Sequence, residues 1–185
     1  MTNYGNPRYW DERYKECEGD MYDWLEDFKS LESLLTQYVK KDSRILILGC
    51  GNANLSEDMY DAGYTDIWNI DISSVVIHQM RERNKHRCHM YYEQMDVCDL
   101  KYPDNFFDIA IDKSTIDALL CGDNAFVLVA LMMKETQRVL KENGHYIGIS
   151  YGKPSTRSFH YKRNFLSWAL KEYSFAPQND ADLTE

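Results

Sequence analysis

The chain has 185 residues, enough for one domain, and its 44% hydrophobic and 28% charged residues are ordinary for a soluble globular protein. Its 21 basic and 30 acidic residues give a net charge of −9, which argues against a nucleic-acid partner held through phosphates and suits a basic protein as substrate, although acidity also serves solubility. No apolar run approaches a membrane-spanning length of about 18 residues and no signal peptide opens the chain, so we expect a cytoplasmic monomer without membrane contacts.

The N-terminal part combines a polar arm with aromatic helices. Residues 1–8 predict a loose arm, and residues 9–40 predict helices. Trp10 and Tyr14 are four residues apart and therefore share one helical face, and Tyr22 follows shortly after them. These rings either staple the N-terminal helices to the rest of the domain or form a lid whose flat faces contact a bound cofactor.

The stretch 44–74 has the pattern of a nucleotide-binding βαβ unit. An apolar strand leads into a turn that contains Gly49 and Gly51, a helix follows, and a second strand ends beside Asp71. The glycines let the backbone approach a ligand closely, and the Asp71 carboxylate can accept hydrogen bonds from the two hydroxyls of a ribose. We therefore expect a nucleotide or nucleoside ligand at this turn.

The identity of that ligand depends on a missing glycine. A dinucleotide fingerprint has a third glycine at the position where this chain has Asn54. A GxG turn with an acid about 20 residues further on is instead typical of enzymes that bind S-adenosylmethionine (SAM). We favour SAM as the cofactor, with S-adenosylhomocysteine as its product, over a nicotinamide dinucleotide.

A carboxylate also follows the third predicted strand, Met90–Met95. Asp96 can accept a hydrogen bond from the exocyclic amine of adenine, with Asp99 as the alternative, or it can be a solvated loop residue. Ligands of open α/β sheets bind past the carboxyl ends of the strands, so the position of Asp96 favours binding.

Strands and helices alternate through the rest of the chain, with strands over 106–111 and 145–150 and a long helix over 125–140 that Gly144 caps. The alternation predicts a doubly wound, mostly parallel α/β sheet with helices on both faces and a cofactor-binding core over 44–151. The expected parts of the C-terminal segment are a polar loop (152–157), a short helix (165–170), a sixth strand (172–177) and a disordered acidic tail (178–185).

Cysteine and histidine spacing excludes other chemistries. The five cysteines form no CxxC pair, which favours a reducing compartment and predicts neither a disulfide framework nor a zinc site. The five histidines are scattered, and no arrangement of a Ser/His/Asp triad or of metal ligands is recognisable. We therefore expect no metal.

With these residues assigned, the order and spacing of ILILGCGNANLS, WNIDISS, MDVCDL, FFDIAIDK and RVLKENGHYIGIS resemble a class I SAM-dependent methyltransferase over about residues 9–151. Closer still, YDWL, LGCGN, DISSVVI, MDV and DKSTIDALLCG are similar to the protein-lysine methyltransferases that act on translation elongation factor 1-alpha. Ser114 departs from the subgroup, which usually has glycine there, and Ile116 replaces leucine.

The resemblance implies a Rossmann-like fold with the N-terminal helices as a lid, and a protein substrate such as an elongation factor. A full methyltransferase sheet ends in two further strands, and this chain offers residues for at most one, so we expect a sheet shortened at its C-terminal edge. The resemblance also implies cofactor contacts at Trp10, Tyr14, Tyr22, Gly49, Asp71, Ile72, Asp96, Val97 and Lys113.

Methyl transfer from a sulfonium asks the protein to align an acceptor, exclude water and provide an unprotonated nucleophile. A lysine acceptor, with an ordinary pKa of about 10.4, must lose a proton. Asp112, at the end of the fourth strand, and Asp117 are the candidate catalytic residues, because either could hold the ammonium and relay its proton. Alternatively Asp112 caps the following segment, and Lys113 pairs with the SAM carboxylate or is solvated.

The main hypothesis is thus a protein-lysine N-methyltransferase. A methyltransferase acting on oxygen or nitrogen of a small molecule is the second reading, and a SAM-binding protein without activity is the third. A nicotinamide-dependent oxidoreductase is least favoured, because the third glycine and any hydride-transfer arrangement are missing.

Overall fold

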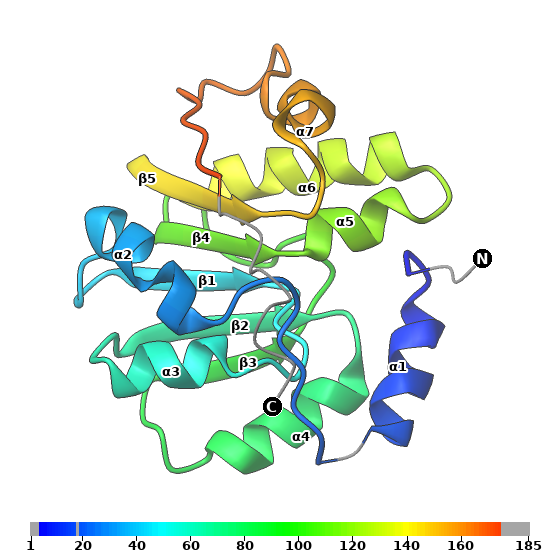
Figure 1. Ribbon diagram of the computed structural model, residues 1–185, viewed down its shortest axis with the longest axis vertical. Helices are drawn as coiled ribbons and strands as arrows, with labels where there is room; N and C mark the ends of the chain where they lie inside the picture. Colours follow the sequence, from blue (N-terminus) through cyan, green and yellow to red (C-terminus); the bar gives the residue numbers. More distant parts are fainter. Residues whose placement is uncertain (1–3, 18, 175–185) are drawn as a thin grey trace, which may run out of the picture.

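The computed structural model describes residues 4–17 and 19–174 of the protein (Figure 1). Its centre is a sheet with all neighbouring strands parallel, in the order β3-β2-β1-β4-β5. The strands are β1 (Arg44–Leu48), β2 (Asp66–Asp71), β3 (Met90–Gln94), β4 (Phe107–Lys113) and β5 (Leu140–Ile149). The helices are α1 (Pro7–Glu16), α2 (Phe28–Tyr38), α3 (Leu55–Asp61), α4 (Ser74–Asn84), α5 (Thr115–Leu120), α6 (Ala125–Val139) and α7 (Pro154–Tyr161).

Alternate side chains of β1 face opposite sides of the sheet, as the pleat of a strand requires. Ile45 and Ile47 belong to the core cluster that α2, α3 and α4 cover, whereas Leu46 and Leu48 belong to the cluster that α5 and α6 cover. All four side chains are at most 3% exposed. Both faces of the parallel sheet are therefore covered by helices, and the predicted doubly wound architecture is confirmed.

The helix α1 contacts α4, and the Gln79 side-chain amide of α4 donates a hydrogen bond to the Tyr14 carbonyl of α1 over 2.9 Å. Figure 1 shows it, in dark blue, past the ends of the strand arrows, at the edge where the strands' carboxyl ends meet. The segment of residues 19–27, called the strap below, connects it to α2 across that edge. In an open α/β sheet this edge is where ligands bind.

The start of the chain is more ordered than the sequence suggested. The helix α1 begins at Pro7, with the Asn6 side chain accepting a hydrogen bond from the Arg8 N–H. The Trp10 indole N–H donates to the Tyr4 carbonyl over 2.7 Å. The prediction of a loose arm is therefore wrong for residues 4–8, because proline at the first helical position and a cap define a helix start. Residues 1–3 lie outside the described part.

The helix α6 ends at Val139, and Gly144 is not its cap but lies within β5. The register of β5 against β4 shifts, because Leu140 pairs with Phe107 while His145 pairs with Ile109. A side chain at Gly144 would start 2.9 Å from a backbone oxygen of β4. The glycine therefore serves the close approach of two strands at this irregularity.

The C-terminal segment differs most from expectation. Helix α7 forms where a polar loop was predicted, beginning at Pro154, whereas residues 165–170 have no regular structure. Residues 162–174 form no strand; the remainder of the predicted sixth strand and the tail 178–185 lie outside the described residues. The Trp168 ring stacks on Tyr146 of β5 at 5.3 Å, so packing of single side chains holds this segment. Among the described helices, none has the length and apolar character needed to cross a membrane.

Candidate functional site

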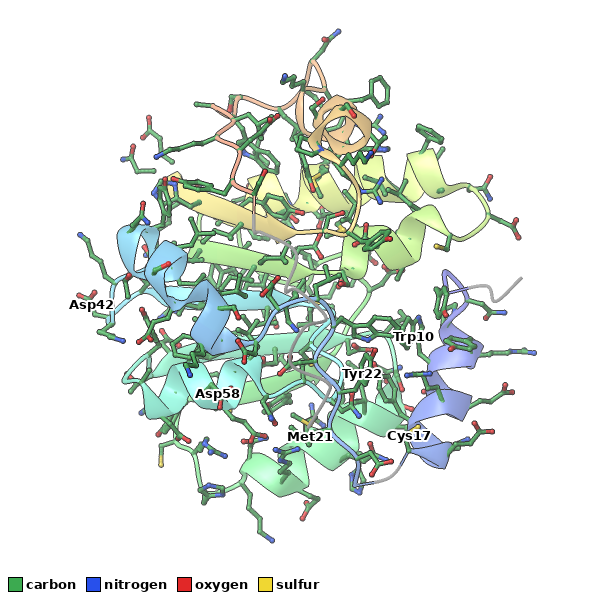
Figure 2. The ribbon with its side chains drawn as sticks, viewed as in Figure 1. Trp10, Cys17, Met21, Tyr22, Asp42 and Asp58 are labelled. Atoms are coloured by element: carbon green, nitrogen blue, oxygen red, sulfur yellow. The ribbon has the colours of Figure 1, made fainter. Side chains whose placement is uncertain are left out.

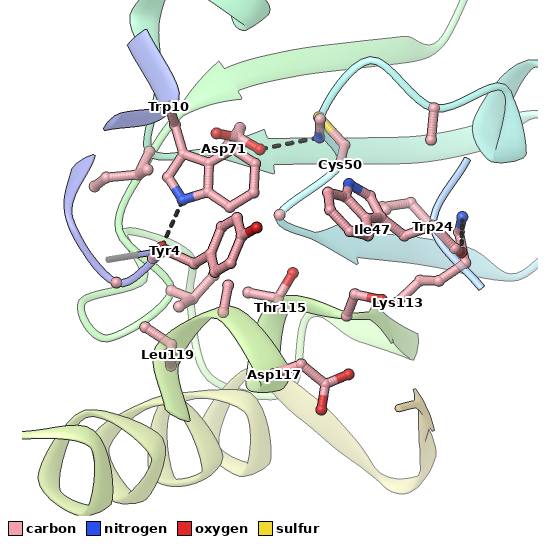
Figure 3. A pocket seen from close by; sticks show the side chains of 18 of the residues that line it. Tyr4, Trp10, Trp24, Ile47, Cys50, Asp71, Lys113, Thr115, Asp117 and Leu119 are labelled. Atoms are coloured by element: carbon pink, nitrogen blue, oxygen red, sulfur yellow. Dashed lines mark hydrogen bonds between the residues drawn. The ribbon is translucent and has the colours of Figure 1, made fainter. Parts of the chain in front are cut away.

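A cavity of about 550 Å³ lies at the carboxyl edge of the sheet, within the size range of small-molecule sites (Figure 3). Its walls come from α1, the strap, the turn after β1, the ends of β2 and β3, and the first turn of α5. Figure 3 shows Trp10, Asp71, Lys113 and Thr115 around it. Parts of the chain far apart in sequence thus meet at one site.

The turn after β1 depends on glycine. Gly49 and Gly51 have φ of +66° and +52°, in the left-handed region that side chains disfavour. A Cβ on Gly49 would lie 2.1 Å from Oγ1 of Thr115, whose hydroxyl donates to the Leu48 carbonyl over 2.7 Å. A Cβ on Gly51 would lie 2.8 Å from the Tyr14 hydroxyl. Both glycines line the cavity, so its floor is backbone that a ligand can approach closely.

Asp71 is fixed beside this turn by two backbone donors. The Gly51 N–H donates to Oδ2 and the Ser73 N–H to Oδ1, each over 2.9 Å. Burial raises the pKa of the Asp71 carboxyl to about 6, although these bonds favour its charged form. At neutral pH the carboxylate is ionised, and its oxygens keep lone pairs for the hydroxyls of a ligand.

The aromatic residues predicted from the N-terminal part line the cavity together. The rings of Trp10 and Tyr14 stack at 5.8 Å, and Tyr14 is only 5% exposed. Tyr22, on the strap, is half exposed at 48%. Tyr14 packs in the main core cluster, as expected of a structural staple, and it also lines the cavity, as expected of a lid.

The residues expected near an adenine also line the cavity. Ile72, Asp96 and Val97 line the cavity, and Asp96 accepts a hydrogen bond from the Cys98 N–H over 2.8 Å. Asp99 does not line it and instead pairs with Lys101. Of the two candidate carboxylates, Asp96 is therefore the one in position.

Lys113 holds the strap. Its ammonium donates to Oδ1 of Asp23 over 2.6 Å and to the Trp24 carbonyl over 2.9 Å, and its side chain is 6% exposed. The side chain borders the cavity, but its charge is already paired. Lys113 therefore lines the cavity and also holds the strap, which forms one of the cavity walls.

Asp112, expected at the acceptor side, is not among the residues that line the cavity. It is fully buried, accepts hydrogen bonds from the Thr115 and Ile116 N–H groups, and accepts another from the Tyr146 hydroxyl over 2.7 Å. Burial raises its pKa to about 7. These contacts agree with the alternative interpretation, in which Asp112 accepts from the N–H groups of the first turn of α5 and thereby positions that helix.

Asp117 lines the cavity but is not a free base. It accepts hydrogen bonds from the Ser150 hydroxyl and from Arg157 Nη2, each over 2.6 Å, and from the Tyr151 N–H over 2.9 Å. The ion pair with Arg157 compensates its charge. Asp117 can therefore orient groups at this end of the cavity, whereas proton uptake would leave a partly buried arginine unpaired.

Sequence reasoning did not anticipate several contacts that build the site. Trp24 lines the cavity, and Thr115 supports the glycine turn. The Ser73 hydroxyl, at the N-cap of α4, donates to Asp11 of α1 over 2.6 Å and so anchors the lid. The motif YDWL drew attention to Trp24, but nothing in the sequence pairs Asp11 with Ser73.

Ser114, which departs from the glycine of the resembled subgroup, has a left-handed backbone conformation. Its φ is +71°, and its buried hydroxyl has no hydrogen-bond partner within the described part of the chain. A non-glycine residue in this conformation costs about 1–3 kcal/mol, and an unsatisfied buried hydroxyl adds to that cost.

We therefore expect Ser114→Gly to raise the free energy of unfolding by about 1 kcal/mol, after allowing for the greater freedom of glycine in the unfolded chain. Urea denaturation measures the change. Ser114→Ala, which removes the hydroxyl but keeps the strained backbone, is the control and should gain less. If Ser114→Gly were only as stable as the parent protein, the backbone at Ser114 would not be strained.

No group of three or more potential metal ligands is found among the described residues. The cavity is lined by the glycine turn, the buried Asp71 carboxylate and aromatic rings. These features suit a ligand with a ribose, an aromatic base and an apolar or cationic sulfur part.

Comparison with known proteins places this geometry in context. The methyltransferase-domain family matches residues 39–174. The mouse (Mus musculus) eEF1A lysine and N-terminal methyltransferase is 36% identical over 183 residues, which cover 96% of this chain and 26% of the mouse protein. The cattle (Bos taurus) EEF1A lysine methyltransferase 4 is 34% identical over 181 residues, covering 93% of this chain and 71% of that protein. The chain thus spans about a quarter of the length of the mouse relative.

Two solved structures are similar in fold. The PH0226 protein of Pyrococcus horikoshii OT3 has a TM-score of 0.57 at 30% identity, covering 65% of this chain and 55% of that one. A SAM-dependent methyltransferase from Methanosarcina mazei has a TM-score of 0.58 at 22% identity, covering 70% of this chain and 62% of that one. The second likeness concerns the fold alone.

Proposed function

Because the chain belongs to the class I SAM-dependent methyltransferases, we propose that it transfers the methyl group of SAM to the side-chain amine of a lysine in a protein. The observation that carries the proposal is the glycine turn and buried Asp71 opening into a cavity with an aromatic, acidic rim. The protein-lysine substrate is taken from the names of the relatives and is proposed for this chain.

The residues present fit the cofactor. Because Gly49 and Gly51 have no side chains, the cofactor can approach the backbone of this turn. A Cβ at either position would collide with a neighbouring side chain even without a ligand. Asp71 would accept from the ribose hydroxyls, and Ile72, Asp96 and Val97 would border the adenine. The cofactor supplies an electrophilic methyl group on a positively charged sulfur. Trp10, Tyr14 and Tyr22 would present ring faces that favour such a cation.

The open side of the cavity suits a long, apolar chain with an amine at its tip. Tyr22 of the strap and Tyr151 after β5 both line the cavity and are 48% and 87% exposed. The methylene groups of a lysine can lie between such rings while its head group passes inward. Asp117, held by Arg157 at the same end, can orient the incoming amine through its remaining lone pairs.

The acceptor must arrive unprotonated or lose its proton on the way in. Asp112 is buried away from the cavity and Asp117 is paired with Arg157, so neither is a strong base. Desolvation between aromatic side chains lowers the pKa of an amine, which lets solvent take the proton. The residues of this chain would thus act by orientation and exclusion of water.

Charge supports a basic protein as partner. The chain carries a net charge of −9, and the strap has acidic residues but no basic ones. Its acidic side chains are Asp20, Asp23, Glu26 and Asp27. Complementary charge around a site speeds association and selects partners. The names of the relatives point to elongation factor 1-alpha as the first protein to test.

The proposal is tested by incubating the protein with methyl-tritiated SAM and a cell lysate, with Gly49→Ala as the inactive control. We expect label in the protein fraction, in the band of elongation factor 1-alpha, and methylated lysine in its peptides by mass spectrometry. Label only in the low-mass fraction would show a small-molecule methyltransferase. Binding of SAM without labelling of any kind would show a binding protein, and either result contradicts the proposal.

A further inference from the structure

Arg157 of α7 is bound at one end of the cavity, although it does not line the cavity itself. Its Nη2 and Nε donate to Oδ1 of Asp117 over 2.6 and 3.2 Å, and Nε also donates to the Ser150 hydroxyl over 2.8 Å. Figure 2 shows α7 at the β5 end of the molecule, away from Trp10 and Tyr22. The two side chains of the ion pair are only 18% and 19% exposed, so its charges act on their surroundings with little screening.

The guanidinium reaches Asp117 by passing over Gly152. A Cβ on Gly152 would lie 2.2 Å from Cζ of Arg157, whereas the φ of this glycine is not positive. The Gly152 N–H donates to the Ser150 hydroxyl over 3.1 Å. The backbone at position 152 would therefore accept a side chain, and it is the arginine that needs the space.

Asp117 is the carboxylate that a methyl acceptor meets. Among the described residues, the charged side chains that line the cavity are Asp71, Asp96, Lys113 and Asp117. The first two are assigned to the cofactor above, and the ammonium of Lys113 is paired with Asp23. Figure 3 shows Asp117 and Asp71 on opposite sides of the cavity. The ion pair with Arg157 therefore sets the charge at the acceptor end.

On the basis of the lysine methylation proposed above, we propose that Arg157 is a positioning residue that compensates the charge of Asp117, so that the acceptor end of the cavity receives the lysine as a neutral amine. An unpaired carboxylate beside the amine would raise the pKa of the amine and hold it as an ammonium ion. With Arg157 in place, the proton leaves to solvent and the nitrogen lone pair is free to form the new N–C bond. Asp117 then accepts a hydrogen bond from an amine N–H and so directs that lone pair inward.

The other ionisable groups around this ion pair belong to β4, β5 and α7. Asp112, at the end of β4, is fully buried, and burial raises its pKa to about 7. Burial also raises the pKa of Tyr146 and of Tyr161, so both hydroxyls stay neutral. Burial and two neighbouring arginines lower the pKa of His160, which is therefore uncharged at neutral pH. None of these four groups changes its charge in the alkaline range in which a lysine loses its proton.

The test is the pH dependence of methylation of purified elongation factor 1-alpha, the acceptor that the names of the relatives suggest. In Arg157→Met we expect kcat at neutral pH to fall about tenfold and KM for the acceptor to fall with it, because Asp117 now holds the ammonium ion. The pH of half-maximal rate should rise by about one unit, and alkaline pH should restore the rate. Arg157→Lys, which keeps the charge but not the fork of donors, should lie between Arg157→Met and the parent protein.

A second variant displaces the guanidinium without removing it. Gly152→Ala should move the end of the Arg157 side chain away from Asp117 and reproduce both shifts, at little cost to the fold because this end is flexible. Lys162→Met is the matched control, since it removes one positive charge from the exposed end of α7 and should keep the parent's kcat, KM and pH profile. These variants should bind SAM with the parent's affinity, because none of the three positions lines the cavity.

A fall in kcat without a shift of the pH profile would show that Arg157 only supports the structure at this end of the cavity, which overturns the proposal. A parent-like profile in both Arg157→Met and Gly152→Ala also overturns it. Failure of the function proposed above looks different. In that case the unaltered protein methylates no lysine of the acceptor at any pH, and the role of Arg157 falls with that function.

Discussion

Replacing Gly49 with alanine should abolish measurable binding of SAM and lower the free energy of unfolding by about 2–4 kcal/mol. The first reason is the backbone, since φ at Gly49 is +66°. The second is space, because the new Cβ would lie 2.1 Å from Oγ1 of Thr115, a contact that no relaxed structure contains. Relief requires moving either the glycine turn or the first turn of α5. Calorimetric titration with SAM and urea denaturation measure the two effects.

Gly63→Ala provides the matched control. Gly63 also has a left-handed backbone, with φ of +98°, but its nearest obstacle is the flexible Lys41 side chain at 3.9 Å, and it lies outside the cavity. This variant should lose stability from backbone strain alone and bind SAM normally. If Gly49→Ala binds SAM as tightly as Gly63→Ala does, the turn after β1 is not the floor of the cofactor site.

Asp71→Asn should weaken SAM by about 30- to 100-fold, a loss of about 2–3 kcal/mol that is typical of a buried charged acceptor. The asparagine fills the same volume but turns one carboxylate oxygen into a donor. That donor must face the Gly51 N–H or the Ser73 N–H, both of which now donate to Asp71. The one remaining oxygen cannot accept hydrogen bonds from a backbone N–H and from both ribose hydroxyls at the same time.

The same residue gives SAM binding a pH dependence. Burial raises the pKa of Asp71 to about 6, so the carboxyl takes up a proton as the pH falls through that value and loses acceptor capacity. The dissociation constant for SAM should therefore rise below about pH 6, by at most about tenfold per pH unit. In Asp71→Asn this dependence should be missing.

Asp66→Asn is the control on the same strand. Asp66 lies at the amino end of β2, where it pairs with Arg44, and it does not line the cavity. Its substitution should leave the affinity for SAM and its pH profile unaltered. An Asp71→Asn variant with the affinity of the parent would reject the assignment of Asp71 to the ribose.

The parts of the fold that local chemistry determines could be predicted from sequence. The run Ile45–Leu48 is apolar on both sides of its pleat, so it had to be a central strand covered by helices on both faces. Gly49 and Asp71, which the sequence predicted to lie at one site, do line one cavity, because a turn after one strand and the end of the neighbouring strand meet at the same edge of the sheet. Elements that depend on a short stretch of sequence could thus be predicted.

The acceptor end could not be predicted with equal success, because it depends on contacts between distant parts of the chain. Asp112 and Lys113 are neighbours at the end of β4, yet one points to α5 and Tyr146 and the other to the strap. The alternation of a strand predicts that they diverge, but it does not tell which of them faces the ligand.

The most direct measurement is a calorimetric titration of the purified protein with SAM and, separately, with a nicotinamide dinucleotide. Binding of SAM at one site per chain, with no heat from the dinucleotide, is expected from the glycine turn, Asp71 and the asparagine at position 54. Absence of SAM binding, or binding of the dinucleotide in its place, would contradict the assignment of this cavity to a methyl-donor cofactor.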